Sequence, residues 1–270
     1  MADADKLFAG SIPRLYDTWM VPLIFADYAT DMAALVAAGS PGAVLEIAAG
    51  SGAVTRALAP RLRADARYVV SDLNQPMLDY AASRQGADDR IEWRQADALH
   101  LPFEDASFDT VVCQFGAMFF PDRVAGHAEA RRVLRPGGRY AFSVWDRIED
   151  NAFANEVTQA VATVFADDPP RFLARTPHGY YDTGLIREDL KRAGFTDVRI
   201  DTHAKVSHAP SAHDAAMAYC QGTPIRNEIE ARDASLLAFA TDRAAEAIAR
   251  HHGDGPVAGK MQAHVIVAVR

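Results

Sequence analysis

The sequence predicts an α/β fold in which helices cover both faces of a mostly parallel β-sheet. Short apolar runs alternate with helical segments between residues 44 and 144, which is typical of successive βαβ units. The apolar runs are continuous rather than alternating, as expected for strands buried on both faces. Turns that contain glycine or proline separate several of these segments. Together these observations favour one layered sheet.

The expected elements follow one another closely along this region. We expect strands at 44–48, 68–71, 91–95, 110–114 and 139–144, and helices at 54–63, 76–84 and 124–134. Pro76 suits the first turn of its helix, where its missing N–H costs nothing. The Arg-Pro-Gly-Gly stretch at 135–138 ends the third helix.

The remaining segments predict a lid and a cap around a core at 43–145. Residues 1–42 form an N-terminal helical lid, whose helix at 23–38 ends at a Gly-Ser-Pro-Gly stretch. Residues 146–182 form a cap insertion, 183–208 add a core helix and strand, 209–260 form a helical cap, and 261–270 form the final core strand. The final strand is expected to pair with the strand at 198–206, so the helices between them cap the sheet.

Composition excludes several classes of protein. The chain has 270 residues and a formal net charge of −8, which argues against non-specific binding to nucleic acid. Two cysteines form no disulfide framework, and no metal-ligand spacing occurs, so we expect no metal site. We find no signal peptide and expect no membrane span, which predicts a cytoplasmic protein. No feature of the sequence sets the oligomeric state.

A glycine-containing turn follows the first predicted strand. Gly50 and Gly52 let a ligand approach the backbone, and the turn leaves helix N-terminal amides free. A dinucleotide site would need Gly-x-Gly-x-x-Gly. Here Ala48 replaces the first glycine and no third glycine follows. Glu46, before the turn, would accept a hydrogen bond from an amine or water and repel a pyrophosphate.

A second acidic residue, Asp72, ends the next predicted strand about 20 residues beyond the turn, where an acid commonly binds ribose hydroxyls. Each acid also has a purely structural interpretation, as a strand-end carboxylate that accepts from local amides. The turn and Asp72 together favour a nucleoside ligand.

With these residues in place, the sequence resembles the class I S-adenosylmethionine-dependent methyltransferases, most closely their type 11, UbiE-like branch. Five segments carry the resemblance in order: 44–52 (VLEIAAGSG), 71–78 (SDLNQPML), 95–103 (QADALHLPF), 107–115 (SFDTVVCQF) and 132–139 (RVLRPGGR). The resemblance implies a Rossmann-like, seven-stranded sheet of order 3-2-1-4-5-7-6 with the seventh strand antiparallel. It also implies S-adenosyl-L-methionine as cofactor and S-adenosyl-L-homocysteine as product.

The resemblance assigns roles residue by residue. The methionine part of the cofactor would lie on Glu46 and the turn, the ribose on Asp72, and the adenine near Asp97. A lid residue, Tyr16, could reach the methionine carboxylate. The residues expected to bind the cofactor are Tyr16, Glu46, Ala48, Gly50, Gly52, Asp72, Leu73, Met77, Asp97, Ala98, Leu99, Gln114 and Phe115.

The expected reaction is direct in-line transfer of the methyl group to a small, partly apolar acceptor. An activated sulfonium needs alignment and exclusion of water more than a fixed catalytic residue. Candidates for the acceptor pocket are Phe25, Met118, Phe119, Phe153, Tyr180 and Tyr181. His178 is the candidate general base, although a surface loop histidine is the simpler interpretation. Carbon, nitrogen and oxygen acceptors stay open.

Two alternatives share this fold. A non-catalytic protein that binds an adenosyl ligand would have the same cofactor residues without a working acceptor pocket. An NAD-dependent oxidoreductase would share the sheet and the ribose acid, but it predicts a third glycine where Ala53 and Val54 stand.

Overall fold

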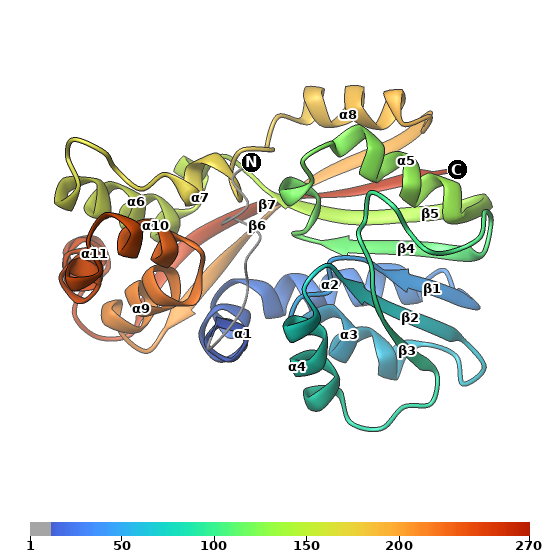
Figure 1. Cartoon of the computed structure of the whole chain (residues 1–270), viewed down its shortest axis with the longest axis horizontal. Coiled ribbons are helices and arrows are strands. Elements are labelled where there is room, and N and C mark those ends of the chain that lie inside the picture. The colour runs from blue at the N-terminus through green and yellow to red at the C-terminus, as the bar shows by residue number, and fades with distance from the viewer. Residues whose placement is uncertain (1–11) are drawn as a thin grey trace.

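A seven-stranded sheet of order β3-β2-β1-β4-β5-β7-β6 runs through the protein (Figure 1). The computed structural model describes residues 12–270. Strands β1 to β5 pair in parallel, and β7 is antiparallel to both β5 and β6. The predicted fold class and strand order are therefore confirmed. The strands are β1 Ala43–Glu46, β2 Arg67–Asp72, β3 Ile91–Gln95, β4 Phe108–Gln114, β5 Leu134–Trp145, β6 Asp197–Ala209 and β7 Val257–Val269.

Helices cover both faces of the sheet, as the continuous apolar strands require. On one face lie α2 (Ala26–Ala37), α3 (Ala53–Leu58) and α4 (Gln75–Gln85), and on the other lie α5 (Arg123–Val133) and α8 (Thr183–Arg192) (Figure 1). Successive strand residues point to opposite faces. Val44 and Val112 accordingly join the core under α2 and α3, whereas Leu45 and Val111 join the other core.

The cap is built around one end of the long antiparallel pair of strands β6 and β7, which pair along their full length. Helices α6 (Ala152–Val164), α7 (Phe172–Arg175), α9 (Ala212–Gly222), α10 (Ile225–Asp233) and α11 (Leu237–His252) gather at that end (Figure 1). The prediction that residues 257–260 belong to the cap is wrong, because they open β7. Val257, Gly259 and Met261 alternate with exposed residues there, which is the pattern of a strand with one buried face.

The N-terminal segment is a longer helix than expected. It starts with α1 (Ile12–Leu15), continues as a π-helical segment at Tyr16–Phe25, and ends with α2. Pro22 lies inside the π-helical segment, where its missing N–H interrupts the usual ladder of hydrogen bonds. Residues 1–11 of the predicted lid lie outside the described residues.

One helical stretch in this segment, Tyr16–Ala37, is long and apolar enough to cross a membrane, with a mean hydropathy of 1.4. The prediction that no stretch reaches this length and composition is therefore wrong. Half of its most apolar window is buried inside the fold, and Met20, Leu23 and Ile24 belong to the hydrophobic core. A core helix passes the same test of length and composition, so the finding is weak evidence for a span.

The turn after β1 has an unusual backbone. Ala48, Gly50 and Gly52 have φ values of 52°, 57° and 84°, in the left-handed region that disfavours a side chain. A Cβ atom at Gly116 would lie 2.4 Å from the Cβ of Ala48. The absence of a side chain at Gly116 therefore provides the space for the Ala48 methyl group.

We expect Ala48→Gly to stabilise the protein by about 1 kcal/mol, because glycine adopts the left-handed backbone without strain. The free energy of unfolding in urea measures this. The neighbouring substitution Ala49→Gly is the matched control, since Ala49 is not among the positive-φ residues, and it should destabilise the protein. Equal destabilisation by both variants would contradict the proposal that the backbone at Ala48 is strained.

A buried histidine, His127, lies between α5 and the sheet. Its Nε2 is 3.2 Å from the hydroxyl of Tyr180, and its Nδ1 has no hydrogen-bond partner in the part of the chain that the structure describes. Burial and then the nearby charge of Arg123 lower the pKa of His127 from 6.5 to about 3. The folded protein therefore keeps this imidazole neutral across mildly acidic pH.

Acid should destabilise the protein through His127. Below pH 6.5 the His127 side chain is protonated in the unfolded chain, whereas in the folded chain it stays neutral until about pH 3. The contribution of His127 to the free energy of unfolding is therefore fully present above pH 6.5 and is lost as the pH falls. At pH 5 the loss from this group is about 2 kcal/mol relative to pH 8. His127→Gln should show a correspondingly shallower decline in urea unfolding between these pH values, and an unchanged slope would contradict this account.

Candidate functional site

A large cavity opens at the carboxyl ends of β1, β2 and β4, with about 1130 Å³ of empty space that includes its open mouth. Doubly wound sheets bind ligands at this edge. Every residue expected to contact the cofactor lines it except Gly52. Gly52 instead begins α3 at φ 84°, and a Cβ there would meet the Cβ of Ala81 at 3.0 Å. Its role is to allow the turn and close packing against α4.

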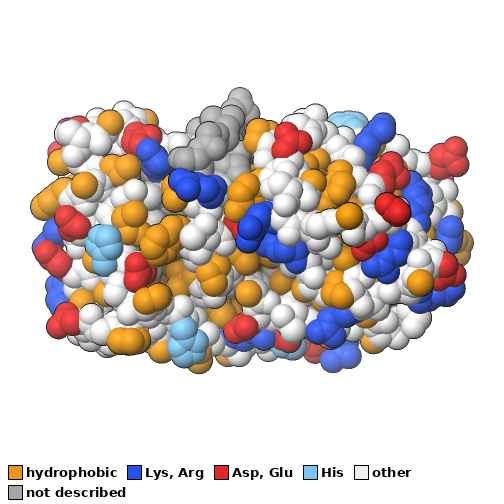
Figure 2. All heavy atoms as spheres, turned by 90° about the horizontal axis from the view of Figure 1, so that it is seen from below, with side chains coloured by type: hydrophobic (Ala, Val, Ile, Leu, Met, Phe, Trp, Pro, Cys, Tyr) orange, Lys and Arg blue, Asp and Glu red, His pale blue; other side chains and the backbone are white. Residues whose placement is uncertain are grey.

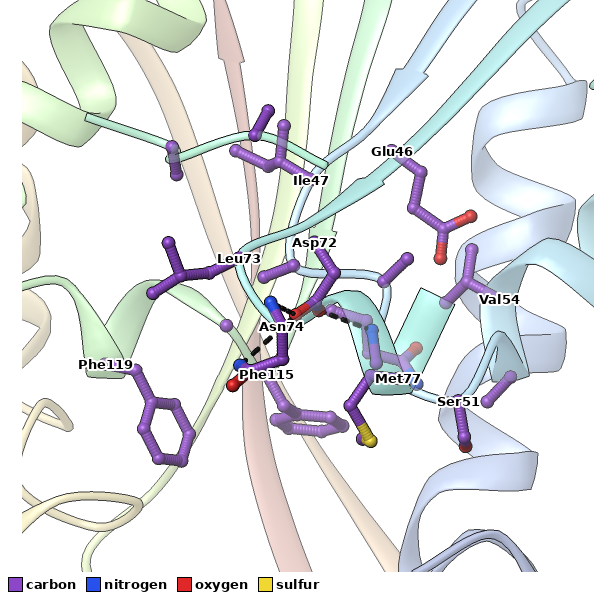
Figure 3. Close-up of a pocket in the computed structure, with 18 of the residues that line it drawn as sticks. Glu46, Ile47, Ser51, Val54, Asp72, Leu73, Asn74, Met77, Phe115 and Phe119 are labelled. Carbon is purple, nitrogen blue, oxygen red and sulfur yellow. Dashed lines mark hydrogen bonds between the residues drawn. The ribbon is translucent and has the colours of Figure 1, made fainter. Parts of the chain in front are cut away.

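Asp72 ties the two neighbouring strand ends together (Figure 3). One carboxylate oxygen accepts from the amide of Gly50 at 2.8 Å, and the other accepts from the amide of Asn74 at 2.8 Å. Burial raises the pKa of Asp72, and these amide bonds oppose the rise. Oδ1 also accepts from the side-chain amide of Asn74 at 3.4 Å, whereas Oδ2 can accept a second hydrogen bond from a hydroxyl group in the cavity.

Glu46 is buried beside the turn. Its Oε2 accepts from the hydroxyl of Thr55 at 2.8 Å and from the hydroxyl of Tyr68. Its Oε1 has no hydrogen-bond partner among residues 12–270, and Glu46 lines the cavity. Burial raises the pKa of Glu46 to about 7. A cation in the cavity would therefore favour the ionised carboxylate.

The part of the cavity beside Leu73 and Asp97 is more exposed than the part beside Glu46. Leu73 is 45% exposed, whereas Met77 is buried, and both line the same cavity as Asp72. The side chain of Asp97 is about half exposed, and its Oδ1 accepts from the Leu99 amide at 2.9 Å. The distance from Oδ2 of Asp97 to Nδ1 of His100 is 3.9 Å, which is too long for a hydrogen bond.

Asp17 links the N-terminal helical segment directly to the glycine turn through hydrogen bonds. Its Oδ1 accepts from the Ser51 hydroxyl at 3.0 Å and from Arg56 at 2.6 Å, while Arg56 also donates to the Ser51 carbonyl. Gln114 makes a second link, because its Nε2 donates to the Phe25 carbonyl at 3.3 Å. Sequence reasoning missed Asp17, since no local pattern relates a lid residue to a turn 34 positions away.

A second cavity, with about 520 Å³ of empty space, lies between the lid, the sheet edge and the cap. It shares four lining residues with the first cavity, namely Tyr16, Phe25, Phe115 and Phe119. The predicted acceptor residues Phe25, Met118 and Phe119 line it. Sequence reasoning missed other lining residues, which come from separate elements and share no motif: Met20, Ile24, Trp145, Asn151, Leu173, Pro177, Tyr219, Thr223 and Pro224.

Three predicted acceptor residues line neither cavity, so those predictions are corrected. Phe153 packs instead beneath Gly259 of β7 and against the ring of His252 at 5.2 Å. Tyr180 is fully buried and donates to Asp189 at 3.0 Å. Tyr181 is 44% exposed. The loop places alternate residues in different surroundings, which its composition did not reveal.

His178 lines the second cavity and is buried rather than on the surface. Its Nδ1 lies 2.8 Å from the carbonyl oxygen of Asp146. Burial lowers the pKa of His178 to about 4, so its imidazole is neutral near pH 7. Within residues 12–270 no three His, Cys, Asp or Glu side chains are grouped to hold a metal ion.

Comparison with known proteins agrees with the resemblance seen in the sequence. The methyltransferase domain family matches residues 45–142. A demethylmenaquinone methyltransferase of Deinococcus radiodurans is 44% identical over 108 residues, which cover 40% of this chain and 44% of the relative. The chain thus spans less than half the length of this curated relative.

A longer match extends past the family domain. The demethylmenaquinone methyltransferase of Lactobacillus johnsonii is 38% identical over 170 residues, covering 58% of this chain and 68% of the relative. Among solved structures, phosphoethanolamine N-methyltransferase 2 of Haemonchus contortus in complex with S-adenosyl-L-methionine has a TM-score of 0.57 at 18% identity, covering 96% of this chain and 56% of that one. This last likeness shows the fold alone. The chain belongs to the class I S-adenosylmethionine-dependent methyltransferases, in their type 11 branch.

Proposed function

We propose that the protein transfers a methyl group from S-adenosylmethionine to a small, partly apolar molecule held in the second cavity. The observation that carries the proposal is the wall of Tyr16, Phe25, Phe115 and Phe119, which belongs to both cavities. A methyl donor in the first cavity and a methyl acceptor in the second would both contact these four residues and so lie close to each other. Direct transfer needs that proximity.

The residues of the first cavity fit the cofactor. Among residues 12–270, the hydrogen bonds to the Glu46 carboxylate fall on Oε2, so its Oε1 suits an ammonium group. The buried Oε1 of Gln114 likewise has no partner within these residues. Gly50 adopts the left-handed backbone of the turn at φ 57°, which a residue with a side chain rarely adopts. When bound, S-adenosylmethionine supplies a methyl group on an activated sulfonium. The chain itself binds, orients and excludes water, with Asp17 holding the lid closed over the turn.

The residues that would bind the methyl acceptor lie mostly in the cap, outside the domain that the family shares. The matched domain ends at residue 142, whereas Asn151, Phe172, His178 and Tyr219 of the second cavity lie beyond it. Two relatives are named as demethylmenaquinone methyltransferases. Their names support the proposal that the acceptor is an apolar ring compound. A non-catalytic adenosyl-binding protein would have no need of a second cavity that shares a wall with the first, which favours the enzyme.

Partners and location complete the proposal. Acidic and basic side chains are interspersed on the face shown in Figure 2, and the net charge is −8. Both favour a small-molecule partner over nucleic acid. We propose a cytoplasmic location, with the apolar Tyr16–Ala37 helix serving as a lid and core helix.

Calorimetric titration should show binding of S-adenosylmethionine and S-adenosylhomocysteine but not NAD. Asp72→Asn should weaken S-adenosylhomocysteine binding by about 1–3 kcal/mol, because an amide replaces a charged acceptor of the ribose hydroxyls. Glu92→Gln is the matched control, since Glu92 pairs with Arg67 on the exposed side of β3 and should leave affinity unchanged. Binding of NAD alone would rule out the proposed function.

A further inference from the structure

Two polar side chains that line the second cavity, Asn151 and Thr223, already make hydrogen bonds to the backbone around them. Asn151 donates to the carbonyls of Arg147 and Gln262 at 3.1 and 3.2 Å and accepts from the Gln262 amide at 3.0 Å. Thr223 donates to the Tyr219 carbonyl at 2.7 Å. Both side chains have committed their donors to backbone carbonyls, and each also accepts from a backbone amide, since the Ile225 amide lies 3.4 Å from the Thr223 hydroxyl oxygen.

His178 differs from these two side chains. Its Nδ1 lies 2.8 Å from the Asp146 carbonyl, and a carbonyl oxygen can only accept, so Nδ1 carries the proton. A neutral imidazole has one proton, which leaves a lone pair on Nε2. Nε2 has no hydrogen-bond partner among the described residues, and the side chain lines the cavity. The Asp146 carbonyl therefore fixes both the tautomer and the orientation of the ring.

The walls around His178 are flat and aromatic. Phe115 and Trp145 stack with ring centroids 3.9 Å apart and an interplanar angle of 8°. Phe25 lies 5.5 Å from Phe115 and 5.9 Å from Trp145, and the Trp145 ring is 6.1 Å from that of His178. Such walls bind a planar ring by offset or edge contacts.

We propose that the methyl acceptor is a flat apolar ring that carries a hydroxyl group, and that this hydroxyl donates a hydrogen bond to Nε2 of His178. The inference rests on the proposed function and adds a specificity-determining residue to it. A ring without a donor would bury Nε2 with no partner, which carries a desolvation cost. His178 thus selects hydroxyl-bearing rings over otherwise similar ones.

The test uses two probes, 1-naphthol and 1-methoxynaphthalene, which share a ring system but differ in the hydroxyl donor. Each is titrated by calorimetry into the full-length protein saturated with S-adenosylhomocysteine. We expect the protein to bind 1-naphthol about tenfold more tightly, the effect of one buried hydrogen bond and the avoided unpaired acceptor.

Two substitutions separate recognition from structural support. His178→Asn keeps a donor near the Nδ1 position, so it can retain the bond to Asp146, but it loses the acceptor and should abolish the preference. His178→Gln places its amide near the Nε2 position, so it should lose the bond to Asp146 yet keep part of the preference. The exposed histidine variant His213→Asn is the control and should behave as the unsubstituted protein. Urea unfolding of each variant shows that it is folded.

The outcomes distinguish the inference from the proposed function. A full preference for 1-naphthol in His178→Asn, or its loss in His178→Gln alone, would assign His178 a structural role and overturn the inference. Binding of S-adenosylhomocysteine with no preference between the probes would overturn the inference and leave the proposed function standing. Failure of S-adenosylhomocysteine to bind would overturn both.

Discussion

The hydrogen bond from the Gly50 amide to the buried Asp72 carboxylate, at 2.8 Å, is the constraint on which the first cavity depends. The same carboxylate accepts from the Asn74 amide, so one side chain sets the spacing between the loops after β1 and β2. Charge-assisted bonds of this kind are strong where water is excluded. They hold the turn in its left-handed backbone and leave Leu73 and Met77 facing the open space beside it.

The junction between the two cavities follows from the parallel sheet. Parallel strands end at one edge, so the residues that follow them are neighbours. Phe115 follows β4 with a left-handed φ of 54°, and its ring stacks on Trp145 at the end of β5. The lid adds Tyr16 and Phe25, whose rings stack at 5.1 Å. The wall that the two cavities share is thus made from segments that the sheet and the N-terminal helix bring together.

Sequence reasoning predicted the sheet and most of the first cavity, because their signals are local: a strand, a turn and an acid within one motif. It failed where the arrangement depends on distant segments. His178 faces the second cavity, whereas Tyr180, two residues later, is buried against Asp189. No periodicity in that loop distinguishes them. Asp17 likewise meets Ser51 only after folding, and β7 begins early because β6 offers it a partner at Ala209.

A crystal structure of the protein with S-adenosylhomocysteine tests the central claim most directly, because the position of the sulfur shows where a methyl group would be presented. Our account places the ribose within hydrogen-bond distance of Asp72 and the sulfur against the wall of Tyr16, Phe25, Phe115 and Phe119 that both cavities share. A sulfur directed toward solvent, or an adenosyl group bound away from Asp72, would contradict it.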